Sequence, residues 1–220
     1  MRKLFLTLFI LAWVSVAQAT VVYVDLSGGD DDTGDGSYGN PYLTTTKGDD
    51  GLSAGDEVRV AKSTISALSG TLSFTEGSAS VSTTADLSGT LSAGDLISKN
   101  DGWDEGWWEV SSVSSDTITL SVLYYGSDES GVTGYTVAKS PDARQSFAVS
   151  GSSESNRFSI SGGWDLTTQT RDGITLIFTD DSYQSVLQSS SNYVEVSYFL
   201  IASTEENTNG FNITGAGTYV

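Results

Sequence analysis

The chain has 220 residues, of which 28 are acidic and 10 basic, giving a net charge of −18 at neutral pH. So acidic a surface argues against nucleic acid or an anionic membrane as a partner, because either would need clustered cations. The sequence contains no cysteine and no histidine, which excludes disulfides, thiolate chemistry and any mechanism that depends on imidazole.

Residues 1–19 have the layout of a signal peptide. Arg2 and Lys3 precede an apolar run from Leu4 to Val16, and Ala17-Gln18-Ala19 supplies a small-x-small cleavage site. We therefore expect a secreted protein or one displayed on a cell surface. The apolar run is shorter than the ~20 residues of a spanning helix, so we expect no membrane span after cleavage. An uncleaved anchor is the alternative.

Two short strands are predicted in the next segment, residues 20–63. The β-branched and aromatic residues of Val21–Val24 favour the first strand. Alternation in Glu57–Val60 places Val58 and Val60 on one face of the second. Between them, Leu43–Asp50 is too short and too rich in threonine to predict a stable helix.

An acidic loop, Ser27–Gly39, connects the two parts of this segment and consists largely of Gly, Asp, Ser and Thr. Its oxygen density suits a hard cation such as calcium, which makes Asp31, Asp32 and Asp35 candidate metal ligands and Ca²⁺ the candidate cofactor. In an EF-hand beginning at Asp31, however, the twelfth position is Tyr42, which offers no carboxylate. The simpler interpretation is a solvated turn, and we favour it over the metal site.

The same features resemble the opening of a known fold. The matching residues are Tyr23-Val24-Asp25, Asp35-Gly36-Ser37 at the end of the loop, Asn40-Pro41-Tyr42 and Ala54-Gly55-Asp56. Together they resemble the start of right-handed parallel β-helix proteins of the pectate-lyase-like superfamily. The resemblance implies an all-β solenoid whose coils stack at the spacing of paired strands, roughly 4.8 Å.

Residues 64–138 differ in texture from what surrounds them. Short strands at close spacing, separated by Gly, Ser and Asp turns, predict a small antiparallel barrel or sandwich inserted into a coil of the β-helix. The segments Ala93–Ile97, Trp108–Val110 and Ser115–Leu120 resemble small β modules of phage tail and surface proteins. This resemblance makes a viral tail or fibre component an alternative function. The signal peptide argues against it, because virion proteins are normally assembled in the cytoplasm.

Three tryptophans lie among three carboxylates in Gly102–Glu109. Aromatic rings stack on sugar rings and carboxylates accept hydrogen bonds from sugar hydroxyls, so the cluster predicts a glycan contact. The candidate contact residues are Trp103, Asp104, Glu105 and Trp107. The alternative is that the rings cover the module's own core and loops, which strand alternation favours for Trp108 and leaves open for Trp103.

Residues 139–220 return to short strands joined by polar turns, and we expect further coils of the β-helix here. Aligning 185–194 with 211–220 stacks Leu187 on Ile213 at an offset of 26 residues, a period that fits one coil. On this alignment the next coil begins where the sequence ends. We therefore expect either a fragment of a longer protein or an open end covered by another chain through self-association.

The leading functional prediction is a structural and recognition protein, with the β-helix as a shaft and the inserted module as a glycan contact. The alternative is a polysaccharide lyase or glycoside hydrolase whose catalytic coils are missing or unrecognised. The resemblance implies an Arg or Lys base with calcium-binding acids for the lyases, and clustered Asp for the hydrolases. No such motif is recreated by the turn residues, so no catalytic role is assigned to them: Arg157, Asp165, Arg171 with Asp172, and Asp180-Asp181.

Overall fold

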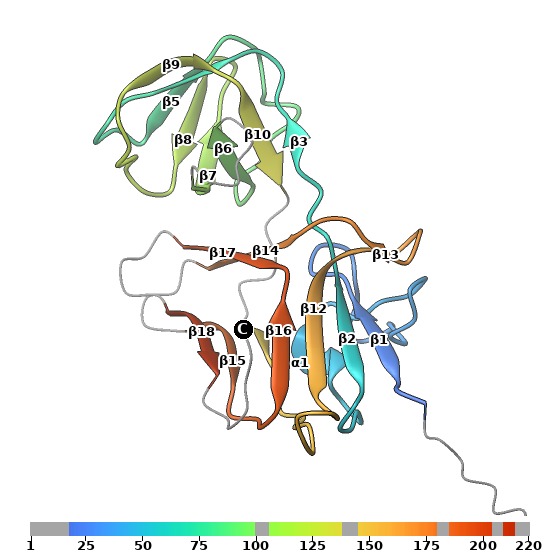
Figure 1. Ribbon diagram of the computed structural model, residues 1–220. Helices are drawn as coiled ribbons and strands as arrows, with labels where there is room; N and C mark the ends of the chain where they lie inside the picture. The colour runs from blue at the N-terminus through green and yellow to red at the C-terminus, as the bar shows by residue number, and fades with distance from the viewer. Residues whose placement is uncertain (1–17, 100–105, 138–144, 180–184, 204–208, 214–220) are drawn as a thin grey trace, which may run out of the picture.

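A computed structural model describes residues 18–99, 106–137, 145–179, 185–203 and 209–213 (Figure 1). The described part is all-β, as predicted, apart from one helical turn. Parallel sheets lie in the lower half of the view and a curled antiparallel sheet lies above them. None of the described helices combines the length and apolarity needed to cross a membrane.

The parallel part is made of three sheets. The first sheet contains four parallel strands, β1, β2, β12 and β16, and β13 pairs with β12 in the antiparallel direction. The second sheet consists of β11, β15 and β18. The third consists of β14 and β17. The strands are β1 Val21–Val24, β2 Glu57–Ala61, β11 Gln145–Ser146, β12 Phe158–Asp165, β13 Thr170–Arg171, β14 Thr175–Thr179, β15 Ser185–Ser189, β16 Val194–Ser197, β17 Phe199–Ser203 and β18 Asn209–Ile213.

The registers of the first sheet stack like on like. Val22 pairs with Val58, Val58 with Ile160 and Ile160 with Val196 across four parallel strands. Val58 and Ile160 have no exposed surface, and they belong to the apolar core between the parallel sheets. The predicted alternation of Val58 and Val60 is confirmed, because both side chains are fully buried while Arg59, the residue between them, faces outward.

The predicted stacking of Leu187 on Ile213 is wrong by two residues. Leu187 pairs with Phe211, an offset of 24 residues. Residues two apart on a strand share a face, so a slip of two leaves the apolar pattern unchanged. The sequence pattern alone therefore did not distinguish the two registers.

A one-turn helix, α1 (Thr45–Gly48), forms where the sequence predicted none. Thr44 caps it in an extended conformation, and its side chain accepts the Lys47 N–H at 3.2 Å. The buried Thr45 donates from its N–H and hydroxyl to the side-chain oxygen of Gln145, at 3.0 and 3.3 Å. Contacts with a distant strand, rather than intrinsic propensity, thus stabilise the turn.

The antiparallel sheet contains eight strands in the order β3-β10-β6-β7-β8-β5-β4-β9 and curls as a half-barrel around its own apolar core. All of its strands lie between residues 66 and 137 of the chain. They are β3 Ser66–Ala67, β4 Leu72–Phe74, β5 Ser80–Thr83, β6 Leu96–Lys99, β7 Trp108–Val113, β8 Thr117–Leu120, β9 Glu129–Val132 and β10 Gly134–Val137.

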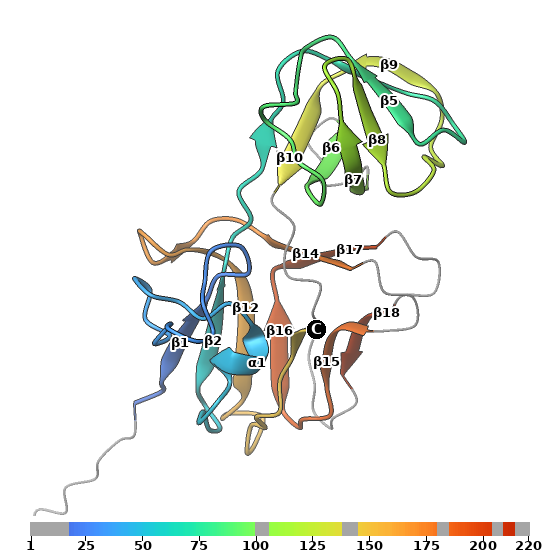
Figure 2. The ribbon, with the colours of Figure 1, turned by 180° about the vertical axis from the view of Figure 1, so that it is seen from behind.

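The two parts meet at an apolar junction. Strands β14 and β17 lie directly beneath the antiparallel sheet in both views (Figures 1 and 2). Leu176 and Phe178 of β14 pack there against side chains from the sheet above. The buried side chains of the junction are Leu96, Trp107, Val137, Leu176 and Phe178.

Candidate functional site

The outer face of the first parallel sheet carries alternating aromatic and arginine side chains. Tyr23 of β1, Arg59 of β2 and Ser161 of β12 are in register, at positions between the inward-facing residues. Beyond Arg59, further aromatic and arginine side chains follow on β12, on β13 and in the turn after β16. We call these residues the aromatic–arginine row: Tyr23, Arg59, Trp164, Arg171 and Tyr198.

Guanidinium groups alternate with rings along the row. The Arg59 guanidinium carbon lies 3.9 Å from the centre of the Trp164 ring and 5.9 Å from that of Tyr23. The Arg171 guanidinium carbon lies 5.6 Å from the Trp164 ring and 4.1 Å from the Tyr198 ring. These are cation–π distances, so each cation orients the rings beside it.

A β-bulge places Trp164 in the row. The pairing of β12 with β2 shifts register between Ser161 and Trp164, and Gly163 within the bulge has a φ of 78°. Simple alternation from Ser161 would turn Trp164 towards the core, whereas one extra residue turns it outward. Its indole N–H donates to the Ser161 hydroxyl at 2.8 Å, which fixes the ring beside Arg59.

Tyr198 presents its ring from a strained backbone. It joins β16 to β17 with a φ of 65°. This left-handed conformation is energetically unfavourable for residues other than glycine. Its carbonyl accepts the Thr175 N–H at 3.1 Å, so the corner is held by the neighbouring strand β14. The side chain remains 51% exposed. Strain of this kind recurs at functional sites, where the surrounding structure maintains it.

The arginines on this face differ in how they are neutralised. Arg59 pairs with Glu57 at 2.9 Å, and Glu57 also accepts the Ser161 hydroxyl at 2.7 Å. Arg157 lies 3.2 Å from Glu154 and 3.5 Å from a second glutamate. Arg171 has no carboxylate within 4.0 Å among the described residues. It is therefore the row's uncompensated cation.

A lysine holds two carboxylates next to the row. Lys62 contacts Asp165 and Asp172, each at 2.9 Å. The hydrogen bond from Lys62, with backbone N–H groups donating as well, lowers the pKa of Asp165 from 3.8 to about 2. The same contacts raise the pKa of Lys62 above its usual value. Asp165 is thus an ionised structural group, which does not suit it to act as a catalytic acid at neutral pH.

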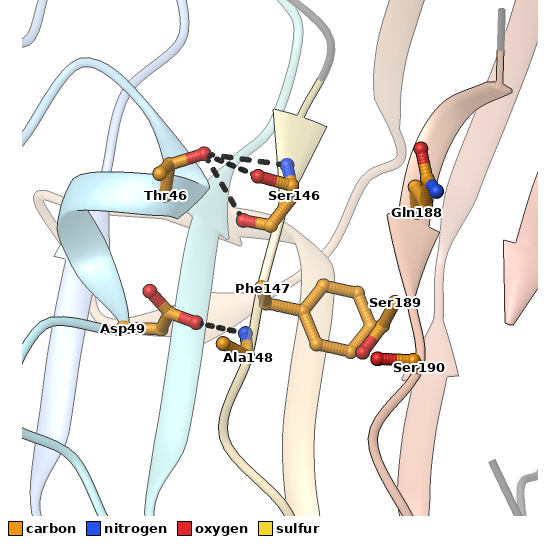
Figure 3. Close-up of a pocket in the computed structure, with 8 residues that line it drawn as sticks. All are labelled: Thr46, Asp49, Ser146, Phe147, Ala148, Gln188, Ser189 and Ser190. Carbon is orange, nitrogen blue, oxygen red and sulfur yellow. Dashed lines mark hydrogen bonds between the residues drawn. The ribbon is translucent and has the colours of Figure 1, made fainter.

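A polar pocket of about 360 Å³ lies elsewhere, between α1, β11 and β15 (Figure 3). Asp49 is 7% exposed, and burial raises the pKa of its carboxyl group. It accepts the Ala148 N–H across the pocket. No second carboxylate occurs among the described residues of the lining, so the pocket lacks the acid pair of a glycosidase. The lining residues are Thr46, Asp49, Ser146, Phe147, Ala148, Gln188, Ser189 and Ser190.

The predicted calcium ligands Asp31, Asp32 and Asp35 are not brought together as a metal site. Asp31 accepts the Leu43 N–H at 2.8 Å and so ties the loop to the segment before α1. Asp35 accepts the Ser37 N–H at 2.9 Å within its own turn. No group of three acidic side chains that suits a metal ion occurs in the part of the chain that the structure describes. Asp31 and Asp35 thus accept backbone N–H groups and stabilise turns of the loop, and calcium binding by the three aspartates stays a prediction.

The predicted glycan contact falls only in part within the described residues. Trp103, Asp104 and Glu105 lie outside them, and their role stays a prediction. Trp107 is 4% exposed and packs in the apolar junction, so its ring is not presented to solvent. Nothing among the described residues accepts its indole N–H. Asp180-Asp181, weighed as enzyme candidates, also lie outside the described residues.

Sequence reasoning missed the aromatic–arginine row. Tyr23 and Arg59 stand at outward positions of two predicted strands, and this is the one signal that the sequence offered. Trp164 and Tyr198 reach the outer face only through a bulge and a left-handed corner, which break the alternation on which the strand predictions depend.

No protein-family model and no curated protein matches this chain. Among solved structures it is similar to the tailspike gp49 of Pseudomonas phage LKA1, with 16% identity, a TM-score of 0.34 and coverage of 67% of this chain and 26% of that one. The Gp54 tailspike of Acinetobacter baumannii bacteriophage AP22, solved with A. baumannii capsular saccharide, gives 11% identity, a TM-score of 0.34 and coverages of 75% and 35%. The tailspike gp61 of Pseudomonas phage phi297 gives 14% identity and a TM-score of 0.30, with coverage of 92% of this chain and 35% of that one. The chain thus spans between 26% and 35% of these proteins.

Proposed function

We propose that this chain is an extracellular or surface-exposed recognition protein that binds a glycan through the aromatic–arginine row. Its parallel strands would be coils of a right-handed parallel β-helix, and residues 64–138 an inserted antiparallel module. Support for the β-helix comes from the like-on-like pairing of Val22, Val58, Ile160 and Val196 over four strands. Stacked coils of this kind bury side chains that no single coil could bury alone.

The row itself is the observation that carries the glycan-binding function. Trp164 and Tyr198 offer partly exposed ring surface for stacking on sugar rings. Arg171 supplies hydrogen-bond donors beside the rings, and Glu57 supplies carboxylate oxygens as acceptors. Apolar surface with a few fixed polar groups is the composition of a ligand site. The rings and guanidinium groups hold one another in place, so little order would have to be gained on binding.

A glycan array followed by calorimetric titration of the best ligand tests this proposal. We expect the double variant Trp164→Ala with Tyr198→Ala to lose at least about tenfold in affinity, equivalent to about 1.4 kcal/mol. Tyr125→Ala is the matched control, because Tyr125 is an aromatic residue 75% exposed on the antiparallel module. Unchanged affinity in the double variant, with circular dichroism like that of the wild type, would rule out the row as the contact.

The contact predicted from the sequence at Trp103, Asp104 and Glu105 is a separate proposal. Trp103→Ala belongs in the same titration. Loss of binding in Trp103→Ala with retention in the row variant would assign the glycan contact to the module instead. The reverse result would assign it to the row.

A viral tail or fibre component is the second candidate function. It is supported by the resemblance of residues 93–124 to phage modules and opposed by the leader-like residues 1–19. Fusing residues 1–19 to a phosphatase that is active only outside the bacterial cytoplasm separates the two. Export of the phosphatase favours the secreted protein, and retention in the cytoplasm favours the virion component.

A polysaccharide lyase or hydrolase is the remaining alternative. Incubation with acidic and neutral polysaccharides, with and without calcium, tests it directly. New reducing ends or unsaturated products would establish an enzyme, whereas binding without either product supports a recognition protein.

A further inference from the structure

We propose that the glycan bound by the aromatic–arginine row carries carboxylate groups and that Arg171 binds one of them. This inference rests on the proposed glycan-binding function of the row and names the chemical class of its ligand. Arg171 lies within the row, between two aromatic rings, and its charge is not balanced by a neighbouring carboxylate among the described residues.

The neutralisation of the neighbouring cations distinguishes Arg171 from them. Arg59 is bound by Glu57 through two of its nitrogens, each at 2.9 Å. Lys62 is held between Asp165 and Asp172. A paired guanidinium or ammonium group has few donors left for a ligand, whereas Arg171 retains donors that match the two oxygens of a carboxylate.

The position of Arg171 is fixed without a salt bridge to any described carboxylate. It is the direct cross-strand partner of Trp164 in the β12–β13 hairpin. Its guanidinium group lies 4.1 Å from the centre of the Tyr198 ring, on a corner that the Thr175 N–H holds. Ring contacts orient a guanidinium group while leaving its N–H groups in the plane free to donate. The group is thus preorganised for a planar anion.

Because the whole chain is acidic, an anionic ligand needs a local positive contact such as Arg171 in order to bind. At a net charge of −18 the protein repels anionic polymers at long range. At physiological ionic strength that repulsion decays over about 8 Å, so contacts at the surface decide whether an anion binds. Two acidic groups lie close to Arg171 in the sequence or across the hairpin. They are Asp165 and Asp172, and Lys62 forms a salt bridge with each of them. The row therefore offers an anion a positive contact on an otherwise acidic protein.

The test compares polysaccharides that differ only in their carboxylates. Alginate and hyaluronan are each titrated against the protein of residues 1–220 beside their carboxyl-reduced derivatives. We expect the wild type to bind each carboxylated form at least tenfold more tightly than its reduced form. Arg171→Gln should bind both forms equally, and Arg171→Lys should recover only part of the preference because lysine is a point donor.

Arg157→Gln is the matched control, since Arg157 already pairs with Glu154 and Glu195, and it should keep the full preference. Equal binding of both forms by the wild type, or a preference that survives Arg171→Gln, would overturn the inference while leaving glycan binding intact. An absence of wild-type binding to all four polysaccharides would also overturn the inference, whereas the proposed function would fall only if the glycan array gave no ligand at all. Melting temperatures of all variants exclude unfolding as the cause of a loss.

Discussion

Tyr198 combines an unfavourable backbone conformation with an exposed ring at the end of the row. A left-handed conformation costs a residue with a β-carbon roughly 1 kcal/mol, and asparagine tolerates it better than tyrosine. We expect Tyr198→Asn to keep or raise the free energy of unfolding, by up to about 1 kcal/mol, while weakening glycan binding. Chemical denaturation and calorimetric titration measure the two effects separately.

Tyr38→Asn is the control for this trade-off, because Tyr38 is also about half exposed, at 53%, but has no positive φ. It should lose ring area without gaining stability. A Tyr198→Asn protein that is less stable than the wild type would contradict this expectation. It would show that packing of the Tyr198 ring stabilises the fold by more than the left-handed backbone costs.

Asp165 links the stability of the fold to pH. Its pKa falls from 3.8 to about 2 in the folded protein, chiefly because Lys62 donates a hydrogen bond to it. A lowered pKa means that the ionised form stabilises the fold. This contribution is complete above pH 3.8 and disappears as the pH falls through about 2.

We therefore expect Asp165→Asn to lower the melting temperature at neutral pH and to have a much smaller effect near pH 2. Thermal unfolding across the acid range gives the comparison. Asp32→Asn, at an exposed loop carboxylate, should leave the neutral melting temperature unchanged. A deficit of Asp165→Asn that persists undiminished at pH 2 would contradict the proposed contribution of the ion pair.

At the scale of elements, the bulge in β12 sets the geometry of the row. Gly163 has a φ of 78°, and a β-carbon there would overlap the carbonyl oxygen of Gly173. The Gly163 carbonyl also accepts the N–H groups of Asp172 and Gly173 at 3.2 and 3.1 Å, which joins the bulge to the turn before β14. The bulge thus positions both Trp164 and the hairpin that carries Arg171.

Gly163→Ala should destabilise the protein by about 2 kcal/mol or more, since it combines a disfavoured φ with a clash against backbone. It should also reduce glycan binding by moving Trp164. Gly89→Ala is the control, because open space surrounds that position and its φ is not positive. Urea denaturation gives the free energies. Equal values for the two variants would mean that the bulge tolerates a side chain.

The sequence predicted those elements that depend on local patterns. Val21–Val24 was placed with the bounds that the structure gives it, because β-branched residues favour a strand wherever they pack. Helix α1 was missed because its stabilising partner, Gln145, is 100 residues away from Thr45 in the sequence. Contacts of that range leave no local signal.

The candidate site was less predictable than the fold. The row collects residues from four strands and a corner, and one of those strands bulges. The prediction of a glycan contact followed the density of tryptophan in the sequence, yet Trp107 packs inside the junction. Local richness in aromatic residues does not distinguish a ring that binds a ligand from one that joins two parts of a protein.

At the scale of the whole molecule, the apolar junction couples the antiparallel sheet to the parallel sheets. Trp107 contributes the largest side chain of its buried cluster, against Leu176 and Phe178 of β14. Removing a buried tryptophan side chain costs about 3 kcal/mol or more. Each part also has its own apolar core, so loss of the junction should separate their unfolding.

We expect scanning calorimetry to resolve two unfolding transitions in Trp107→Ala where the wild type shows one. Trp107→Phe should keep the coupling, because phenylalanine retains an apolar ring and the indole N–H has no acceptor among the described residues. Val81→Ala, within the core of the antiparallel sheet, should lower stability without affecting the junction directly. If Trp107→Ala melts in a single transition shifted no further than that of Trp107→Phe, the junction does not couple the two parts. The antiparallel sheet would then be held to the parallel sheets by its connecting segments alone.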